Sequence, residues 1–599
     1  MFCKEYPRPN LVRKNWENLN GIWDFEFDDL KIGLKEKWHK HKEFTKKINV
    51  PFVFQSELSG INDSKFHDVV WYKRKFKIDS SWKDKEIIIN FEAVDYIAKI
   101  YINGEFVGEH QGGHVGFSLN ITDYLNWNEE EIVVYVFDPS IDQTIPRGKQ
   151  FWKEQSEGIW YTRSTGIWQT VWLEAVNSKR IELVQTTPNL DKGSVEFLIE
   201  TTDFKNENLD VELEITFKGE VISKDIFNLN KIFIKREIDI FNQDIFRGPY
   251  HHSGWCWTPE TPNLFNYKII LSQNKIKLDE VEGYFGMRKV HIDNGKVYLN
   301  NRPYYQKLVL DQGYWPKSLM TAPTDEDLKK DILLSKEMGF NGCRKHQKVE
   351  SQRFLYWADV LGFLVWGEMP SCIEYNYDSV KNITNEWLEV LKRDYNHPSV
   401  VAWVPLNESW GVPRIGFDKK EQDHSLSLYY MLHSLDSTRL VISNDGWELT
   451  KSDICAVHNY NHGNKSESKK YNKFIEDIKT KKNILMSEPA GKRIYAKGFK
   501  HEGEPILLTE FGGIAYDTTK SSGWGYSVAT SEEEFIEDYE RVLSAVEKSE
   551  IVVGFCYTQL CDVEQEINGL LTYDRQPKCS LEVIKSINEK IDLTNYIED

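Results

Sequence analysis

Several features that would direct a protein to a membrane, a structural metal or a nucleic acid are missing from these 599 residues. The eight cysteines include no Cys-x-x-Cys pair, which argues against a zinc framework and against a disulfide scaffold. No apolar run reaches the roughly 18 residues that a membrane helix needs, and the N-terminal residues show no signal-like apolar segment. The formal net charge of −18 opposes binding to nucleic acid or to an anionic membrane. From these absences we expect a cytoplasmic protein with reduced, mostly buried thiols.

Aromatic residues, in contrast, are plentiful. They make up 13% of the chain, and 20 of them are tryptophans. Flat apolar rings fill the cores of β-sandwiches, and they also stack on the C–H faces of sugar rings. We expect core packing for most of the tryptophans and carbohydrate contacts for some.

The first half of the chain has the sequence pattern of β-strands. Residues 1–176 contain short alternating segments separated by Asn, Asp and Gly, and Asn103–Gly104 joins two of them in the manner of a hairpin turn. This pattern predicts an antiparallel sandwich. Residues 177–287 continue it with about seven strands, which predicts a smaller immunoglobulin-like sandwich.

Residues 288–599 alternate between strands and helices. Thr324 is a predicted N-cap, and Gly339 follows the end of the same helix. A second helix is predicted within 531–549, with Phe535 and Tyr539 on its apolar face. Eight strands separated by helices predict a (β/α)8 barrel, and we place them at 304–310, 339–346, 363–368, 400–408, 440–446, 454–460, 506–513 and 553–559. The long region after the sixth strand, 461–505, is expected to carry an active-site loop.

Polar residues gather where the predicted barrel strands end, which is the face that forms the active site in such barrels. They are Arg344, His346, Glu368, Asn407, Glu408, His458, Asn459, Tyr460, Glu510, Tyr557 and Gln559. A packed core gains nothing from so many polar groups. A cleft that binds a ligand rich in hydroxyl groups would use them.

Two of these residues are carboxylic acids on the fourth and seventh strands, Glu408 and Glu510. Carboxyl groups about 5–5.5 Å apart suit retaining glycoside hydrolysis, in which one protonates the leaving oxygen and the other attacks the anomeric carbon. An ionised nucleophile raises the pKa of a neighbouring acid, which keeps that acid able to donate its proton. Asn407 could hydrogen-bond the sugar 2-hydroxyl.

Four stretches resemble glycoside hydrolase family 2, the family of bacterial β-galactosidase, β-glucuronidase and β-mannosidase. "NHPSVVAWVPLNES" (396–409) resembles its acid/base signature, and "PILLTEFGG" (505–513) its nucleophile signature. "AKIYINGEFVGEHQGGHVGFSLNIT" (98–122) is similar to its jelly-roll sugar-binding domain, and "EGYFGMRKVHIDNGKVYLNNRPYY" (282–305) to the junction into its barrel. The resemblance covers nearly the whole chain.

The resemblance implies a three-domain retaining exo-glycosidase that needs no redox or organic cofactor. It implies that Glu408 is the acid/base and Glu510 the nucleophile, that Asn407 holds the 2-hydroxyl, and that Arg344 and Tyr460 hydrogen-bond Glu510. Weaker candidates to line the glycone pocket are His346, Glu368, His458, Trp524 and Tyr557. A loop of the first domain, "PRGKQFW" (146–152), would reach the barrel mouth.

The sequence also departs from known members. The Asn-x-Lys motif with which β-glucuronidase-like members hold the sugar carboxylate reads Asn568–Gly569–Leu570 here, without the lysine. "NESWGVP" (407–413) does not match the β-galactosidase metal-site pattern, so no metal is predicted. Three acids after the eighth strand, Asp562, Glu564 and Glu566, would favour a neutral glycone if they reach the pocket rim.

We therefore expect a β-galactoside first. The alternatives are an α-L-arabinofuranoside, a β-galactofuranoside, a β-glucoside or a β-mannoside, with a β-glucuronide least favoured. A carbohydrate-binding protein on an inactive hydrolase scaffold is the competing class, and the presence of both glutamates argues against it. The expected partner is a small carbohydrate, with no nucleic acid and no membrane, and a homo-oligomer is compatible with the sequence.

Overall fold

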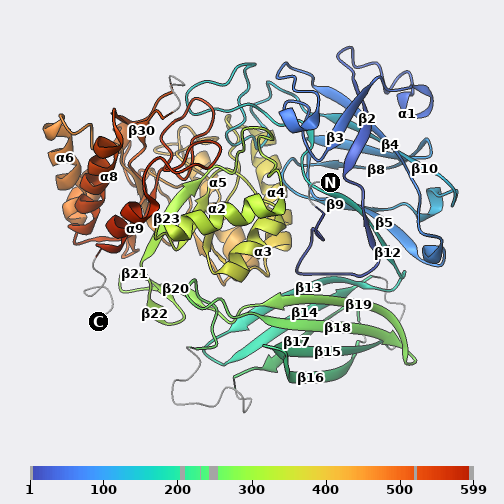
Figure 1. The fold of residues 1–599 in the computed structure, drawn as a ribbon. Coiled ribbons are helices and arrows are strands. Elements are labelled where there is room, and N and C mark those ends of the chain that lie inside the picture. The colour runs from blue at the N-terminus through green and yellow to red at the C-terminus, as the bar shows by residue number, and fades with distance from the viewer. Residues whose placement is uncertain (1–3, 203–208, 230, 242–253, 519–522, 592–599) are drawn as a thin grey trace.

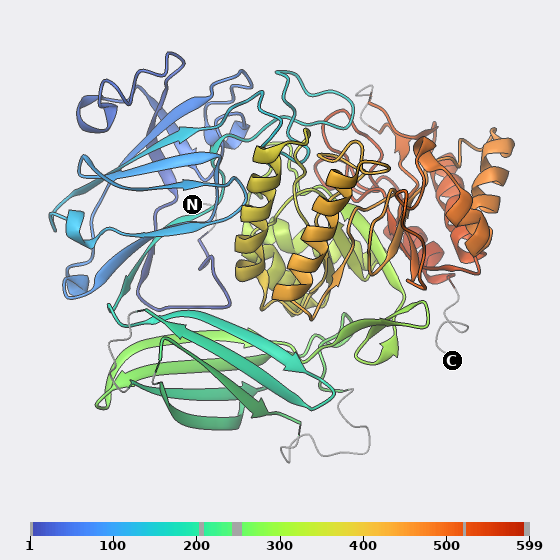
Figure 2. The same cartoon turned by 180° about the vertical axis from the view of Figure 1, so that it is seen from behind.

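The computed structural model describes residues 4–202, 209–229, 231–241, 254–518 and 523–591. Three units pack against one another: an N-terminal sandwich, a second sandwich beneath it, and a C-terminal barrel beside the first (Figures 1 and 2). Within the described residues, no helix combines the length and the hydropathy needed to cross a membrane. The seven cysteines in the described part are buried.

The N-terminal unit is an antiparallel sandwich. One sheet has the order β1-β12-β5-β9 and the other the order β3-β2-β4-β10-β7-β8, with a short β11-β6 pair beside them. Alternating side chains such as Trp23, Phe25, Ile87, Ile89 and Leu173 fill the space between the sheets. The elements are β1 (Trp16–Asn18), β2 (Gly21–Phe27), α1 (Trp38–His41), β3 (Lys46–Val50), β4 (Val69–Phe76), β5 (Glu86–Phe91), β6 (Val94–Asp95), β7 (Ile97–Ile102), β8 (Glu105–Gln111), β9 (Phe117–Asn120), β10 (Glu130–Phe137), β11 (Gly166–Ile167) and β12 (Val171–Val176).

The hairpin predicted at Asn103–Gly104 is confirmed. β7 pairs with β8 in antiparallel register, with Ile102 opposite Glu105. Both turn residues have positive φ, 50° and 81°, which is the backbone that a two-residue hairpin with Asn-Gly adopts.

The second unit contains seven strands in the described residues, as the pattern predicts. A sheet with the order β13-β14-β17 faces one with the order β16-β15-β18-β19. Their inward side chains, among them Phe197, Leu213 and Phe265, form a separate core. The strands are β13 (Ile181–Asn189), β14 (Ser194–Thr201), β15 (Leu209–Phe217), β16 (Glu220–Leu229), β17 (Phe233–Asp239), β18 (Phe265–Gln273) and β19 (Ile276–Phe285). A small sheet of β20 (Val290–Asp293), β21 (Lys296–Leu299) and β22 (Arg302–Pro303) leads into the barrel.

The C-terminal unit is the expected barrel, and each of the eight predicted strands is present. They are β23 (Gln306–Asp311), β24 (Gly342–Lys345), β25 (Leu364–Glu368), β26 (Val400–Val404), β27 (Leu440–Val441), β28 (Cys455–His458), β29 (Ile506–Glu510) and β32 (Val552–Tyr557). Their pairings are parallel, in the order β27-β26-β25-β24-β23-β32-β29-β28. Between β27 and β28 the backbone is joined by single hydrogen bonds, from Asp453 N–H to Val441 O and from His458 N–H to Gly446 O.

Helices cover the outside of the barrel (Figure 2). The main ones are α2 (Asp325–Glu337), α3 (Gln352–Leu361), α4 (Tyr377–Asp394), α5 (Lys419–Leu435), α8 (Glu532–Glu547) and α9 (Leu581–Glu589). The Thr324 hydroxyl caps α2 by accepting from the backbone N–H of Asp327, as predicted. Phe535 and Tyr539 of α8 are fully buried, also as predicted.

The segment 461–505 differs from our expectation of a long active-site loop. Much of it is helical, as α6 (Ser468–Lys479) and α7 (Lys481–Met486). Tyr471 of α6 donates its hydroxyl to Arg541 O on α8, so the segment packs on the outer helical layer. Phe474 and Ile478 lie on one face of α6 and are buried. Their spacing is the helical period of 3.6 residues, and this spacing could have predicted the helix from the sequence.

A loop of the first unit reaches the barrel, as the stretch 146–152 predicts. Both Arg147 N–H and Gly148 N–H donate to Ser371 O, at 3.0 and 3.1 Å. Further along the same loop, the Trp160 ring meets the Trp410 ring edge-to-face at 5.0 Å. Because Trp410 lies two residues after Glu408, this contact brings the first unit to the predicted acid.

Candidate active site

Glu408 lies in a tight turn, four residues beyond the end of β26 at Val404. Glu408 and Ser409 have φ values of 50° and 62°, the left-handed region that non-glycine residues seldom adopt. The backbone N–H of Glu408 donates to Asp445 O at 2.9 Å. Such local strain persists where the surrounding structure holds it, and it gathers at functional sites.

The two predicted acids lie close together at the carboxyl ends of the strands. One carboxylate oxygen of Glu408, one of Glu510 and a ring nitrogen of His458 all lie within 4.8 Å of one another. Glu510 ends β29 and is 5% exposed. An oxygen-to-oxygen distance of at most 4.8 Å is compatible with the carboxyl separation of about 5–5.5 Å that a retaining mechanism uses.

Arg344, from β24, contacts several polar side chains of the site. Its fully buried guanidinium donates from Nη1 to Glu510 Oε1 at 2.7 Å and from Nη2 to Asn407 Oδ1 at 2.6 Å. Its Nε donates to Glu368 Oε2 at 2.6 Å and lies 2.9 Å from Asp445 Oδ2. One cation therefore fixes the orientation of the nucleophile candidate and of the amide beside the acid candidate.

His458 connects the two acids. Its Nδ1 lies 2.9 Å from Glu408 Oε1 and 3.4 Å from Glu510 Oε2, and its Nε2 lies 3.3 Å from Asp445 Oδ1. Burial alone would lower the pKa of His458, but the charges of Glu510 and Asp445 and the hydrogen bond with Glu408 outweigh burial and raise it to about 10. The ring is cationic at neutral pH and donates from both nitrogens.

The nucleophile candidate is held ionised. Burial pushes the pKa of Glu510 upward, yet the positive charges of His458 and Arg344 dominate and lower it to about 2. Tyr460 also donates its hydroxyl to Glu510 Oε2 at 2.8 Å. A carboxylate with this pKa is available for attack at any pH near neutrality.

The two remaining polar candidates support Arg344. Glu368 is fully buried, and burial raises its pKa to about 7 against the opposing charge of Arg344. His346 Nδ1 lies 3.1 Å from Arg344 Nη2 and 3.9 Å from Glu510 Oε1. Burial and the charges of Arg344 and Lys149 hold the pKa of His346 well below its usual value, so the ring is neutral and can accept from Arg344.

One predicted pocket residue needs correction. Tyr557 is fully buried between β32 and α8, against Tyr539 at 4.8 Å and Phe511 at 5.6 Å. Side chains alternate along a strand, and Tyr557 falls on the outward side. Trp524 donates from Nε1 to Gly158 O of the first unit, and its ring meets that of Tyr526 edge-to-face at 5.4 Å, so its role in the glycone pocket stays a prediction.

Two residues that we did not predict belong to the site. Asp445 follows the fifth strand and binds Arg344, His458 and, at 2.5 Å, the Thr509 hydroxyl. Tyr526 stacks on Tyr460 with ring centroids 3.5 Å apart. Asp445 lies at the end of the predicted strand segment 440–446, so its position at a strand end could have identified it as a site residue. Tyr526 has no such signal, because nothing in the neighbouring sequence distinguishes it from Trp524.

The three acids after β32 have separate roles. Asp562 accepts from Lys578 Nζ at 2.7 Å and from Gly569 N–H at 2.8 Å, which are structural contacts. Glu564 accepts from Thr162 N–H, joining the first unit to the barrel. Glu566 accepts from the Tyr161 hydroxyl at 2.6 Å and from Asn568 Nδ2 at 3.1 Å.

Glu408, His458 and Glu510 also offer three ligand atoms at a spacing that a metal ion could use. Binding of a metal there would require His458 to give up its ring proton.

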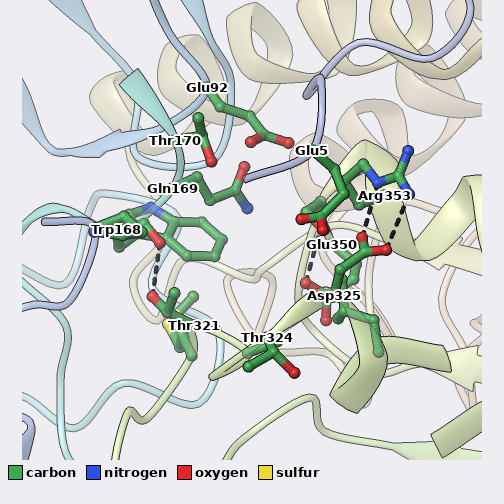
Figure 3. A pocket seen from close by; sticks show the side chains of 15 residues that line it. Glu5, Glu92, Trp168, Gln169, Thr170, Thr321, Thr324, Asp325, Glu350 and Arg353 are labelled. Carbon is green, nitrogen blue, oxygen red and sulfur yellow. Dashed lines mark hydrogen bonds and ion pairs between the residues drawn. The ribbon is translucent and has the colours of Figure 1, made fainter. Parts of the chain in front are cut away.

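A separate cavity lies between the first unit and the barrel (Figure 3). Trp168, Gln169 and Glu92 of the first unit face Thr321, Asp325 and Arg353 of the barrel there. Arg353 pairs with Asp325 at 2.8 Å across its edge. None of the predicted site residues lines this cavity, so it is distinct from the acid pair.

We expect Arg344→Met to destabilise the fold by about 3–5 kcal/mol, because it leaves buried carboxylates without their cation. The lowered pKa of Glu510 stabilises the fold fully above pH ~4.5, the ordinary Glu value, and this contribution is lost as the pH falls through about 2. Without Arg344 the folded-state pKa of Glu510 rises, so its contribution to stability is smaller and is lost over a narrower pH range below about 4.5. Urea unfolding of wild type and variant between pH 3 and 7 measures both effects.

Arg353→Met is the matched control for Arg344→Met. Arg353 pairs with one carboxylate, Asp325, and its side chain is 18% exposed. We expect a smaller loss of stability and no change in the pH dependence. Equal losses in the two variants would contradict the role given to Arg344.

A (β/α)8 barrel with two close carboxyl groups at the ends of its strands is typical of glycoside hydrolases. Sequence models of the family match along almost the entire chain: the sugar-binding domain at residues 16–173, the central domain at 179–288 and the TIM-barrel domain at 290–593. The chain belongs to glycosyl hydrolases family 2.

The relatives found by sequence comparison are named either β-galactosidase or β-glucuronidase. A β-galactosidase of Thermoanaerobacter pseudethanolicus is 28% identical over 428 residues, which are 71% of this chain and 53% of the relative. A putative β-glucuronidase of Formosa agariphila is 25% identical over 72% of this chain and 51% of the relative. The chain thus spans about half the length of these two relatives. The mouse β-glucuronidase is 22% identical to this chain, and the match covers 98% of this chain and 91% of the mouse protein.

Solved structures show the same fold. The apo structure of a β-glucuronidase from Ruminococcus gnavus matches with a TM-score of 0.78 at 19% identity, over 98% of this chain and 100% of that one. A β-glucuronidase of an uncultured Clostridium sp. matches with a TM-score of 0.76 at 20% identity, over 97% and 99% of the two chains. At this identity the similarity concerns the arrangement of all three units.

Proposed function

We propose that the protein is a retaining exo-glycosidase that removes a terminal, neutral glycosyl residue, with a β-galactoside as the first candidate. The single observation that carries the proposal is the Glu408–Glu510 pair, within 4.8 Å and with Glu510 held ionised. A protein that only binds sugar needs no such pair. The names of the relatives divide between β-galactosidase and β-glucuronidase, so they support the class and leave the glycone to experiment.

In the first step Glu510 attacks the anomeric carbon while Glu408 protonates the departing oxygen. The bond from the anomeric carbon to that oxygen breaks, and a covalent glycosyl ester forms on Glu510. Glu408 Oε1 accepts from His458, so the acidic proton belongs on Oε2. Asn407 Oδ1 is held by Arg344, which leaves Nδ2 to donate to the 2-hydroxyl.

In the second step Glu408 takes a proton from water, and the oxygen of that water attacks the anomeric carbon. The ester bond breaks, and Glu510 leaves as a carboxylate. Its lowered pKa makes it a good leaving group. The configuration at the anomeric carbon is inverted twice and is therefore retained.

A cytoplasmic location and the oligomeric state stay predictions. Size-exclusion chromatography with light scattering measures the assembly directly.

The test is hydrolysis of a panel of nitrophenyl glycosides: β-galactoside, β-glucoside, β-mannoside, β-glucuronide, α-L-arabinofuranoside and β-galactofuranoside. We expect a neutral β-glycoside to have the highest kcat/KM and Glu510→Gln to abolish its hydrolysis. Cleavage that Glu510→Gln leaves intact would refute the mechanism. A lack of cleavage of every glycoside, with tight binding of free sugars, would favour the binding-protein alternative.

A further inference from the structure

The ring of Tyr460 is covered by the ring of a second tyrosine, Tyr526. The two rings lie face to face, with centroids 3.5 Å apart and planes at 6° to each other. At this separation their faces are in van der Waals contact, so the Tyr460 ring cannot tilt toward Tyr526. The hydroxyl at the end of the Tyr460 ring donates to Glu510 Oε2 at 2.8 Å. Tyr526 therefore restricts the side chain that hydrogen-bonds the nucleophile candidate.

The Tyr460 hydroxyl has two polar neighbours. It lies 2.8 Å from Glu510 Oε2 and 2.7 Å from Thr558 Oγ1. A hydroxyl carries one proton, and an ionised carboxylate is the stronger acceptor, so Tyr460 donates to Glu510 and Thr558 donates to the Tyr460 oxygen. Both hydrogen bonds depend on the plane of the ring, because a rotation about the side-chain bonds moves the hydroxyl away from both partners.

Tyr526 is anchored to the backbone that follows the nucleophile candidate. Its N–H donates to Gly513 O at 2.8 Å. Directly beyond these two residues, β30 (Ile514–Tyr516) pairs in parallel with β31 (Ser527–Ala529). Gly513 has a φ of 65°, and a side chain there would overlap the Tyr526 ring, so glycine permits the close approach. The Tyr526 ring thus has a fixed position relative to the end of β29.

The segment that carries Tyr526 is also held on its other side. Trp524 N–H donates to Gln565 O, and Ile567 N–H donates to Trp524 O, both at 3.0 Å. The Trp524 side chain donates to Gly158 O of the first unit at 2.9 Å. Hydrogen bonds to several separate parts of the chain therefore support the backbone on which Tyr526 lies.

We propose that Tyr526 is a positioning residue, whose ring holds Tyr460 in the orientation in which the Tyr460 hydroxyl donates to Glu510. The proposal rests on the proposed function, in which Glu510 is the nucleophile. Arg344 donates to Glu510 Oε1 at 2.7 Å and Tyr460 to Oε2, so the carboxylate is presented to the anomeric carbon in one orientation. The role belongs to the ring of Tyr526 and not to its hydroxyl.

The experiment measures kcat and KM on the best nitrophenyl glycoside for Tyr526→Phe, Tyr526→Ala, Tyr460→Phe and the double variant. We expect Tyr460→Phe to lower kcat about 10- to 100-fold, as for a lost hydrogen bond to a charged group. Tyr526→Ala should lower kcat about three- to tenfold, as for a lost aromatic pair, and Tyr526→Phe less than about twofold. KM should change little, because the orientation of the nucleophile matters in the transition state.

The double variant separates positioning from an independent effect. Once the Tyr460 hydroxyl is gone, Tyr526 has nothing to position, so the double variant should lie within about twofold of Tyr460→Phe alone. Losses that multiply in the double variant would overturn the proposal. A loss in Tyr526→Phe as large as in Tyr526→Ala, or a raised KM at constant kcat, would overturn it too, because Tyr526 would then act by binding substrate.

Tyr430→Ala is the matched control. Tyr430 of α5 is 54% exposed and Tyr526 is 41% exposed, so each alanine variant loses a partly exposed tyrosine ring. We expect Tyr430→Ala to leave kcat unchanged, and an equal fall in both variants would contradict a specific role for Tyr526. Tyr526→Leu, which keeps apolar bulk without a flat ring, repeats the test with less risk to the fold.

NMR of isotopically labelled tyrosine reads the position of the Tyr460 ring without turnover. Ring protons over the face of a neighbouring aromatic ring resonate at higher field, and the Tyr460 signal is assigned by its disappearance in Tyr460→Phe. We expect this signal at high field in wild type and Tyr526→Phe, and at lower field in Tyr526→Ala. An unchanged signal in Tyr526→Ala would overturn the proposal. If wild type cleaves no glycoside, the proposed function fails, and this signal still decides whether Tyr526 holds Tyr460.

Discussion

Glu510→Ala is expected to lower kcat by roughly four orders of magnitude or more, the size of effect seen when a catalytic nucleophile is removed. Without the carboxylate no covalent intermediate forms. The deletion also leaves space beside Arg344 and Tyr460 that a small anion can enter. Azide should therefore restore turnover of an activated aryl glycoside, measured as aryl release and as formation of a glycosyl azide.

The configuration of that azide decides the interpretation. A single displacement on a β-glycoside gives the α-azide, because the external nucleophile attacks from the face that Glu510 occupied. Wild type with azide is the control and should show no acceleration through this route. A β-azide from Glu510→Ala, or no rescue in a variant that keeps its unfolding midpoint, would contradict the assignment of Glu510.

Glu408→Gln is expected to give the second largest effect, and its size should depend on the leaving group. For a poor leaving group such as an alkyl alcohol, loss of the general acid costs about 10²- to 10⁴-fold in kcat/KM. A dinitrophenolate departs without a proton, so its first step should fall far less. The measurement is kcat/KM for a series of aryl and alkyl glycosides, plotted against the pKa of the leaving alcohol.

Glu421→Gln serves as the control for Glu408→Gln. Glu421 is a buried carboxylate of α5 that accepts from Arg414, outside the cluster around the acids. We expect it to leave the dependence on the leaving group unchanged. An equal loss for good and poor leaving groups in Glu408→Gln would assign Glu408 to binding instead of proton transfer.

The sequence was sufficient for the parts of the fold that repeat a pattern. Alternating residues predicted the sandwich strands, and apolar segments between helical stretches predicted all eight barrel strands. The caps of α2 and the apolar face of α8 followed from local chemistry. Segment 461–505 was harder, because α6 is a short helix whose polar residues outnumber its apolar stripe.

Site residues could be predicted from the sequence where they end a barrel strand or belong to a motif that resembles the family. Arg344, Asn407, Glu408, His458, Tyr460 and Glu510 are brought together as expected. Tyr557 was misplaced because one residue of register decides whether a side chain faces the cleft or the helices. The position of Tyr526 depends on how loops far apart in the chain meet, and no local pattern carries that information.

The most direct test of the central claim is the configuration of the first sugar released. Proton NMR during hydrolysis of the preferred β-glycoside, recorded faster than mutarotation, distinguishes the two anomers. The account predicts that the β-anomer appears first and the α-anomer later, as the free sugar equilibrates. An α-anomer formed first would mean single displacement by water, which contradicts the role given to the Glu408–Glu510 pair.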